Sequence, residues 1–306
     1  MEKNYRLIIE DFGVLLADCI KDRVGDEVSV EYRAITKNNG VRHHAVLIRR
    51  EGTNISPTIY IDSCYGRYLE GVTIETLVSE VIDIYNNCLT DKDIDVSFFM
   101  DFAKVSEHLA FRAVNYEKNK EELEKVPYRK FEDLAFVPVC VLNNFEEQSG
   151  SVVINHQHLK IWEISEDELW ENVYEHAQEN YPVTITGIEK FVSDRTGIDI
   201  GEVESDILVI SNESLCFGAS AVFFPGVMQK ITGKMKSDAL ILPSSVHETI
   251  VLPSSGNLEL DYNFIDMVKE VNATTLADEE ILSDNVYYYN AKEDTFAAVG
   301  SLLSAK

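Results

Sequence analysis

The feature that most constrains the fold is how the spacing of hydrophobic residues changes along the chain. Between residues 5 and 20, apolar side chains recur every three or four positions, as in a helix with one buried face. Residues 28–34 then alternate apolar and polar side chains, which is typical of a half-buried strand. Asn39-Gly40 favours a tight turn into a second strand at 41–48, and a third strand follows at 58–61. Residues 74–89 return to helical spacing, so the chain is expected to begin helix, three strands, helix.

The rest of the chain mixes both patterns. Residues 97–125 are predicted to be mostly helical and to stop before Pro127. Strands are expected at 134–142 and 151–158, and Ser165 with Glu168 forms a capping box that opens a helix ending near Asn180. Beyond it, the patterns predict strands at 207–211, 239–242, 249–252 and 286–289, and helices at 221–230 and 258–271.

Strands that come in clusters, with helices between the clusters, favour an α+β fold with mixed or partly antiparallel sheets and flanking amphipathic helices. A length of 306 residues exceeds the usual size of one core, so two domains are expected. The charge-dense run at 117–125 places the predicted boundary between residues 1–126 and 127–306.

Acidic residues dominate the second half of the chain. Residues 161–306 hold 26 Asp and Glu but only 8 Lys and Arg, a net charge of −18 within a total of −26. Such a surface repels phosphate and anionic lipid and attracts basic protein surfaces, so direct nucleic-acid binding is not expected. The helix after Ser165 would carry the candidate binding residues on its exposed face: Glu168, Glu171, Glu175 and Glu179.

Cysteine use and hydropathy predict a cytoplasmic protein. The five cysteines lie far apart and form neither a disulfide framework nor a metal-binding CxxC pair, so they are expected to be reduced. Charged residues interrupt the start of the chain where a secretory signal would need an apolar stretch. No apolar segment reaches the length that spans a bilayer, and no cofactor motif is present.

Two histidines offer the strongest metal-ligand pattern, although no metal is expected. His156 and His158 lie two apart on a predicted strand, which would point both imidazoles to one face. A metal site needs a third and usually a fourth ligand, and the sequence places none. A packed or exposed histidine pair is the alternative.

The turn at 242–248 gathers the candidate catalytic residues Ser245, His247 and Glu248. His247 could act as a general base, with Glu248 either as its orienting group or as a metal ligand, but no G-x-S-x-G elbow surrounds the serine. The alternative is a turn in which the serine hydroxyls bond backbone groups. Cys64, with Asp62 nearby, is a second candidate nucleophile, and a buried small side chain is its alternative.

These observations favour a non-enzymatic protein that binds another macromolecule through its acidic half. One special case is a nucleic-acid mimic that occupies the nucleic-acid site of another protein. The alternative class is a hydrolase or transferase in which Ser245, His247 and Glu248 join distant groups such as Asn272 or Asp62. That alternative requires these side chains to converge in a concave pocket.

Several segments spread along the chain carry a family resemblance: residues 59–61, 111–119, 126–129, 132–134, 241–248, 271–272 and 282–287. They resemble a bacterial family catalogued only as domain of unknown function 5688, found mainly in gut-dwelling Firmicutes. The resemblance covers nearly the whole chain and implies a bacterial cytoplasmic protein, while the family supplies no activity that could be assigned to a residue.

Overall fold

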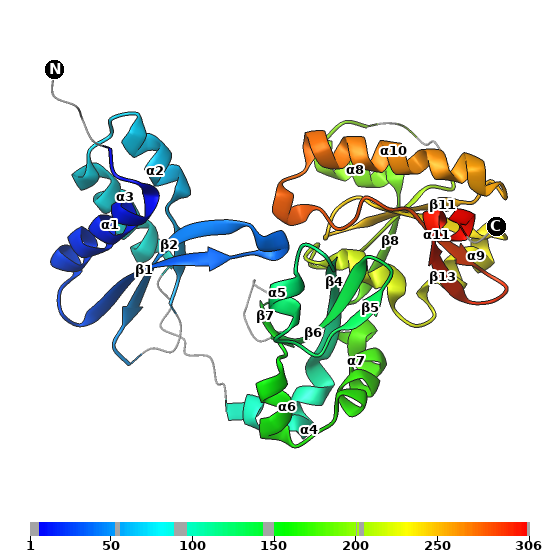
Figure 1. Ribbon diagram of the computed structural model, residues 1–306, viewed down its shortest axis with the longest axis horizontal. Helices are drawn as coiled ribbons and strands as arrows, with labels where there is room; N and C mark the ends of the chain where they lie inside the picture. The colour runs from blue at the N-terminus through cyan, green and yellow to red at the C-terminus, as the bar shows by residue number, and fades with distance from the viewer. Residues whose placement is uncertain are drawn as a thin grey trace. The chain divides into compact units, whose positions relative to one another are not determined.

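The computed structural model describes residues 6–52, 56–88, 97–142, 150–199, 201 and 205–304. The chain forms two compact units, Met1–Val96 and Ser97–Lys306 (Figure 1). Helices and antiparallel sheets make up both units, which confirms the α+β fold class. In the described residues, no helix combines the length and hydropathy that crossing a membrane requires.

The first unit has the predicted helix, three strands and helix, and also a helix, α2, that the sequence analysis does not predict. Its sheet has the order β1-β2-β3, and both pairings are antiparallel. A short 3₁₀ turn at Asn38–Gly40 joins β1 to β2, with Asn39 in the left-handed region at φ 59°. The elements are α1 (Ile9–Val24), β1 (Val28–Thr36), β2 (Arg42–Arg50), β3 (Thr58–Tyr60), α2 (Asp62–Leu69) and α3 (Ile74–Cys88).

Helix α1 packs closely on the sheet because of one glycine. Phe12, Leu16 and Ile20 of α1 are fully buried in the core of this unit. A Cβ at Gly13 would lie 2.4 Å from the ring of Tyr32 on β1, so only glycine admits this contact.

The second unit begins with a four-stranded antiparallel sheet of β4 (Leu109–Asn115), β5 (Arg129–Phe131), β6 (Leu134–Leu142) and β7 (Gly150–Val153). The prediction that residues 97–125 are mostly helical was therefore wrong for residues 109–115, which form β4. Short helices α4 (Phe102–Val105) and α5 (Lys120–Leu123) flank β4 there. Strand β4 is buried on both faces, and a continuous apolar run cannot be told from a buried helix by its period.

One ladder of the second unit crosses the predicted 126/127 boundary. β4 pairs with β6 along its whole length, so this ladder joins residues on both sides of position 126. The division into compact units falls between residues 96 and 97. How many parts of the chain fold independently stays a prediction.

A six-stranded antiparallel sheet follows, with strand order β13-β12-β10-β11-β9-β8. Helices α10 and α11 cover one face of it through Leu240, Ile265 and Val299 (Figure 1). Its strands are β8 (Val183–Gly187), β9 (Leu208–Asn212), β10 (Ala239–Pro243), β11 (Thr249–Pro253), β12 (Tyr287–Asn290) and β13 (Thr295–Ala298). Its helices are α8 (Ile188–Thr196), the 3₁₀ helix η4 (Gly218–Phe223), α9 (Val227–Met235), α10 (Leu258–Thr275) and α11 (Val299–Ser304).

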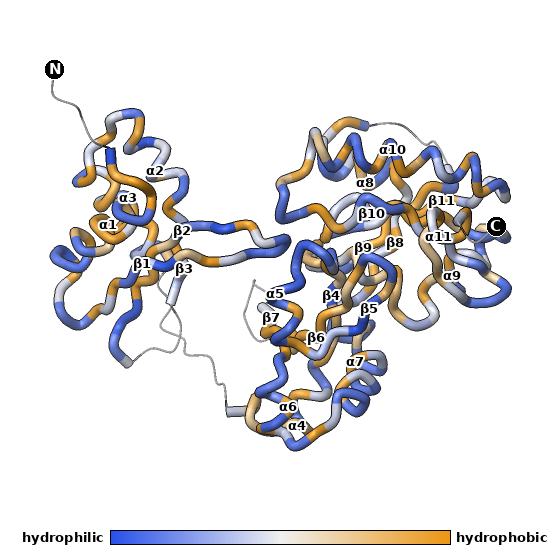
Figure 2. The backbone as a smooth tube through the Cα atoms, in the orientation of Figure 1, coloured by the Kyte–Doolittle hydropathy of each residue, from blue (hydrophilic) through white to orange (hydrophobic). Residues whose placement is uncertain are grey.

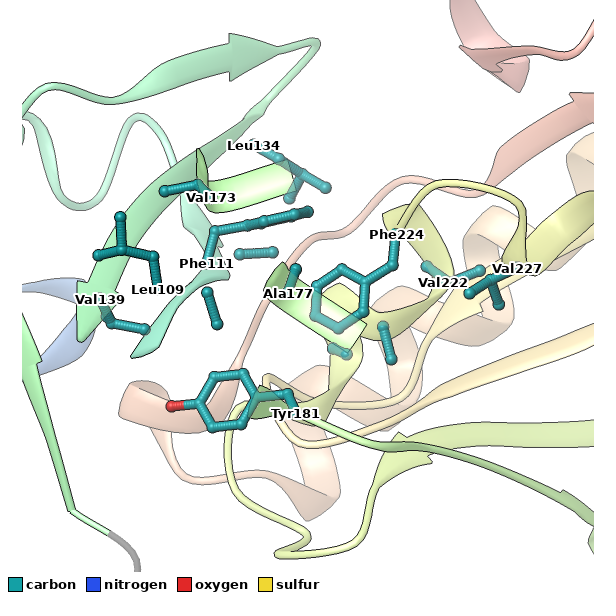
Figure 3. Close-up of a cluster of buried hydrophobic side chains, with 14 of the residues drawn as sticks. Leu109, Phe111, Leu134, Val139, Val173, Ala177, Tyr181, Val222, Phe224 and Val227 are labelled. Atoms are coloured by element: carbon teal, nitrogen blue, oxygen red, sulfur yellow. The ribbon is translucent and has the colours of Figure 1, made fainter. Parts of the chain in front are cut away.

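The largest core of this unit lies between its two sheets. Helix α7 (Glu166–Asn180) contributes Val173 and Ala177, and η4 with the residue after it contributes Val222 and Phe224 (Figure 3). Figure 2 shows hydrophobic residues along the strands and hydrophilic ones on the outer turns of α7. The four-stranded sheet, the six-stranded sheet and α7 therefore share one hydrophobic core.

Candidate functional site

Helix α7 presents the candidate binding residues as expected. The Ser165 hydroxyl accepts a hydrogen bond from the Glu168 N–H at 3.1 Å and caps the helix. Leu169, Val173 and Ala177 are buried. The opposite face exposes Glu168, Glu171, Glu175 and Glu179.

These four carboxylates form no ion pair with any residue that the structure describes. The neighbouring acids of the first turn differ, since Asp167 pairs with Arg129 at 2.5 Å and Glu166 lies 3.5 Å from His156. The four form the uncompensated acidic face of α7.

The turn after β10 gives Ser245 a backbone partner. Ser245 is buried, and its hydroxyl oxygen accepts a hydrogen bond from the His247 N–H at 2.9 Å. The N–H groups of Ser244 and Ser245 both donate to the Glu248 carbonyl oxygen at 3.2 Å. These contacts are those of a serine turn and place no imidazole nitrogen on the hydroxyl.

His247 is held by a different loop. Its Nδ1 accepts a hydrogen bond from the Phe217 N–H at 3.3 Å, and its Nε2 lies 4.0 Å from a carboxylate oxygen of Glu280. Its backbone carbonyl accepts a hydrogen bond from the Ser211 hydroxyl at 2.7 Å. The imidazole therefore supports the loop that contains Phe217.

Glu248 and Asn272 do not converge on His247. The Glu248 carboxylate lies 3.7 Å from Arg195 and accepts a long hydrogen bond from the Ser244 hydroxyl. The Asn272 side chain donates to the Ser283 carbonyl oxygen at 3.0 Å and to Asp284 at 2.8 Å. Two cavities of this unit, with volumes of about 270 and 970 Å³, are lined by other residues. The contacts favour the turn interpretation over a catalytic site.

The expectation that His156 and His158 share a strand face was wrong. Both belong to the first turn of α6 (His156–Trp162), where residues two apart point in different directions. Asn155 caps this helix, and the His158 ring accepts a hydrogen bond from the Asn155 N–H in a capping box. The His158 ring also packs edge-on to Phe99. Within the described ranges, no three His, Cys, Asp or Glu side chains gather as a metal site would require.

Cys64 lies in α2 of the first unit and is buried. Burial raises the pKa of its thiol, with a further contribution from Glu80, so the reactive thiolate is disfavoured. Asp62 accepts a hydrogen bond from the His44 N–H at 3.1 Å and lies 3.6 Å from the His43 ring. These features fit a buried small side chain at Cys64.

Sequence reasoning missed the most unusual polar group of the second unit, Arg112 on β4. Its guanidinium carbon lies 4.5 Å from the centroid of the Phe217 ring. Its Nε is buried and has no hydrogen-bond partner. Burial lowers the pKa of the guanidinium, and the titratable groups that act on it are Tyr181 and Cys216. A basic residue inside a run predicted to be helical gave no signal of this environment.

A family model described as "Family of unknown function (DUF5688)" matches residues 9–291. The chain belongs to this DUF5688 family. No curated protein and no solved structure matches it. For this DUF5688 member, functional assignment therefore depends on the geometry of α7, of the turn after β10 and of Arg112.

Proposed function

We propose that this protein is a non-enzymatic binding protein, and that the acidic face of α7 meets a basic surface of another macromolecule. The observation that carries the proposal is the exposure of Glu168, Glu171, Glu175 and Glu179 without an ion pair in the described part of the chain. Complementary charge on a partner would speed its diffusional encounter with this face. A cytoplasmic location belongs to the same proposal, and its support is that all five cysteines are free.

The catalytic alternative at Ser245, His247 and Glu248 has less support. A nucleophile needs a base within hydrogen-bond reach, whereas the Ser245 hydroxyl bonds to the His247 N–H. The nucleic-acid mimic is a narrower form of the binding proposal, in which the partner is itself a nucleic-acid-binding protein.

The proposal can be tested by affinity capture from cells of the source organism with three forms of the protein as bait. One bait is the wild type, and the second carries Glu171→Gln, Glu175→Gln and Glu179→Gln on α7. The third is a matched control with Glu259→Gln, Asp266→Asn and Glu270→Gln, which removes the same charge from exposed positions of α10.

We expect a partner that elutes as salt rises, because screening weakens contacts between exposed charges. The α10 control should retain it, and the α7 bait should retain much less. Capture of the same proteins in equal amounts by all three baits would refute a role for α7. Displacement of the partner by added DNA would identify the mimic case.

A further inference from the structure

Arg112 is a desolvated cation for which the described residues supply no carboxylate. No ion pair joins it to an acidic side chain there, and its neighbours Tyr181 and Cys216 are neutral at ordinary pH because burial raises the pKa of both. Burying a charge without a partner is costly, and arginine does not shed its proton to avoid that cost. The site therefore has an unmatched positive charge within a strongly acidic protein.

The guanidinium is also oriented. It lies over the Phe217 ring, with 4.5 Å between the guanidinium carbon and the ring centroid. A ring contact of this kind covers one side of the group and leaves the terminal nitrogens free to donate. Arg112 is partly exposed as a residue even though its Nε is buried, so a small molecule can reach the terminal nitrogens.

The loop that holds Phe217 is fixed by several contacts. Asn212 brackets it, accepting from the Cys216 N–H at 3.1 Å and donating to the Cys216 carbonyl oxygen at 2.9 Å. Phe217 itself has φ 51°, a left-handed conformation that is uncommon for a bulky residue. A Cβ at Gly218 would lie 2.3 Å from the Ser211 hydroxyl oxygen, so the loop fits tightly against β9. Backbone strain maintained by surrounding contacts is typical of functional sites.

We propose that Arg112, stacked on Phe217, binds the carboxylate group of a small ligand. The two terminal nitrogens of a guanidinium match a carboxylate in a two-bond fork. A single negative charge suits the site better than a phosphate dianion because there is one cation. Glu179 and Glu213 line the neighbouring 270 Å³ cavity that Tyr181 also borders, and they repel a dianion about twice as strongly as a monoanion. Arg112 and Phe217 lie outside the acidic face of α7, although Glu179 of that face borders the neighbouring cavity.

The test measures urea unfolding of the full-length protein in sodium acetate, sodium phosphate or sodium chloride at equal ionic strength. Acetate should raise the unfolding midpoint of the wild type in a saturable way, since a ligand that binds only the folded state stabilises it. Phosphate strengthens apolar burial in any protein, so it should raise the midpoint without saturation and by the same amount in the wild type and in Arg112→Met. Arg112→Met should abolish the acetate effect, and without acetate it should unfold at a higher urea concentration than the wild type, because it removes the unmatched charge. Arg129→Met, at an arginine already paired with Asp167, is the control that should keep the acetate response.

A spectroscopic measurement reports on the side chain itself. The Nε–H nuclear magnetic resonance signal of Arg112 is assigned by its absence from the spectrum of Arg112→Met. In the wild type, this signal should shift as acetate is added, with the same midpoint acetate concentration as the stabilisation. The proposal is overturned if Arg112→Met is less stable than the wild type or fails to fold, since Arg112 would then have an internal partner. It is equally overturned if phosphate gives a saturable stabilisation that depends on Arg112 and is as large as that of acetate, or if the Nε–H signal does not move.

Discussion

At the scale of single residues, His247 shows how one backbone donor limits the chemistry of a side chain. Because the Phe217 N–H donates to Nδ1, that nitrogen is an acceptor, and any proton of the neutral ring lies on Nε2. The ring therefore couples the turn after β10 to the loop that positions Phe217 beneath Arg112. His247 acts on the structure through this bond.

This role predicts a difference between two substitutions. His247→Ala should destabilise the protein by about 1–2 kcal/mol, because it leaves the Phe217 N–H without its acceptor. His247→Asn places an amide oxygen near the position of Nδ1 and should recover much of that loss. Urea unfolding measures both variants. Equal destabilisation by alanine and asparagine would show that the hydrogen bond contributes little.

At the scale of elements, three consecutive tyrosines of β12 donate hydrogen bonds to carboxylates in other parts of the second unit. Tyr287 donates to Asp133 in the turn between β5 and β6 at 2.7 Å, which joins the two sheets. Tyr288 donates to Asp238, and Tyr289 donates to Asp294 at 2.5 Å. Burial, followed by the partner carboxylate, raises the pKa of all three hydroxyls, that of Tyr288 to about 12.

These pKa shifts predict a loss of stability in alkali. The folded state favours the neutral phenol, so the stabilisation is fully present below the unfolded tyrosine pKa of about 10. It is then lost as pH rises through the folded values. Tyr288→Phe should be less stable than the wild type at neutral pH, yet should lose less stability between pH values of about 9 and 12. Urea unfolding across this range provides the comparison, and an equally steep decline in both proteins would contradict the assignment.

Element prediction from the sequence succeeded for the β1–β2 hairpin and for buried strands such as β6 and β10, and it failed at β4 and α6. The β1–β2 hairpin alternates polar and apolar residues and has Asn39-Gly40 at its turn, and the structure confirms it. Strand β4 is buried on both sides, so its apolar run resembled a helix. Arg112 was missed with it, because its environment depends on Phe217, distant in sequence. The helix at His156 was missed because Asn155 was not read as its cap.

At the scale of the whole molecule, the cores divide as the compact units do. One hydrophobic cluster contains only residues before position 97, and the other three contain only residues after it.

We expect a fragment of residues 97–306 to unfold cooperatively. A fragment of residues 127–306 lacks β4, which exposes the edge of β6 and removes Phe111 from the core, so it should aggregate or stay unfolded. Cooperative unfolding of the shorter fragment would support the 126/127 boundary instead.

The charge of the whole molecule sets the context for α7. A net charge of −26 attracts any basic partner from a distance, so loss of three charges anywhere slows association slightly. Loss of charge from a docking face should slow association more than the same loss elsewhere on the molecule. The α10 control variant separates these two effects.

The most direct measurement is therefore the association rate constant of the captured partner across a range of ionic strength, for the wild type, the α7 variant and the α10 control. Docking at α7 predicts that the α7 variant associates several-fold more slowly at low salt and with a flatter salt dependence, while the control stays close to the wild type. If the two variants change the rate equally, the acidity of α7 acts only as part of the overall charge, and the docking proposal is contradicted.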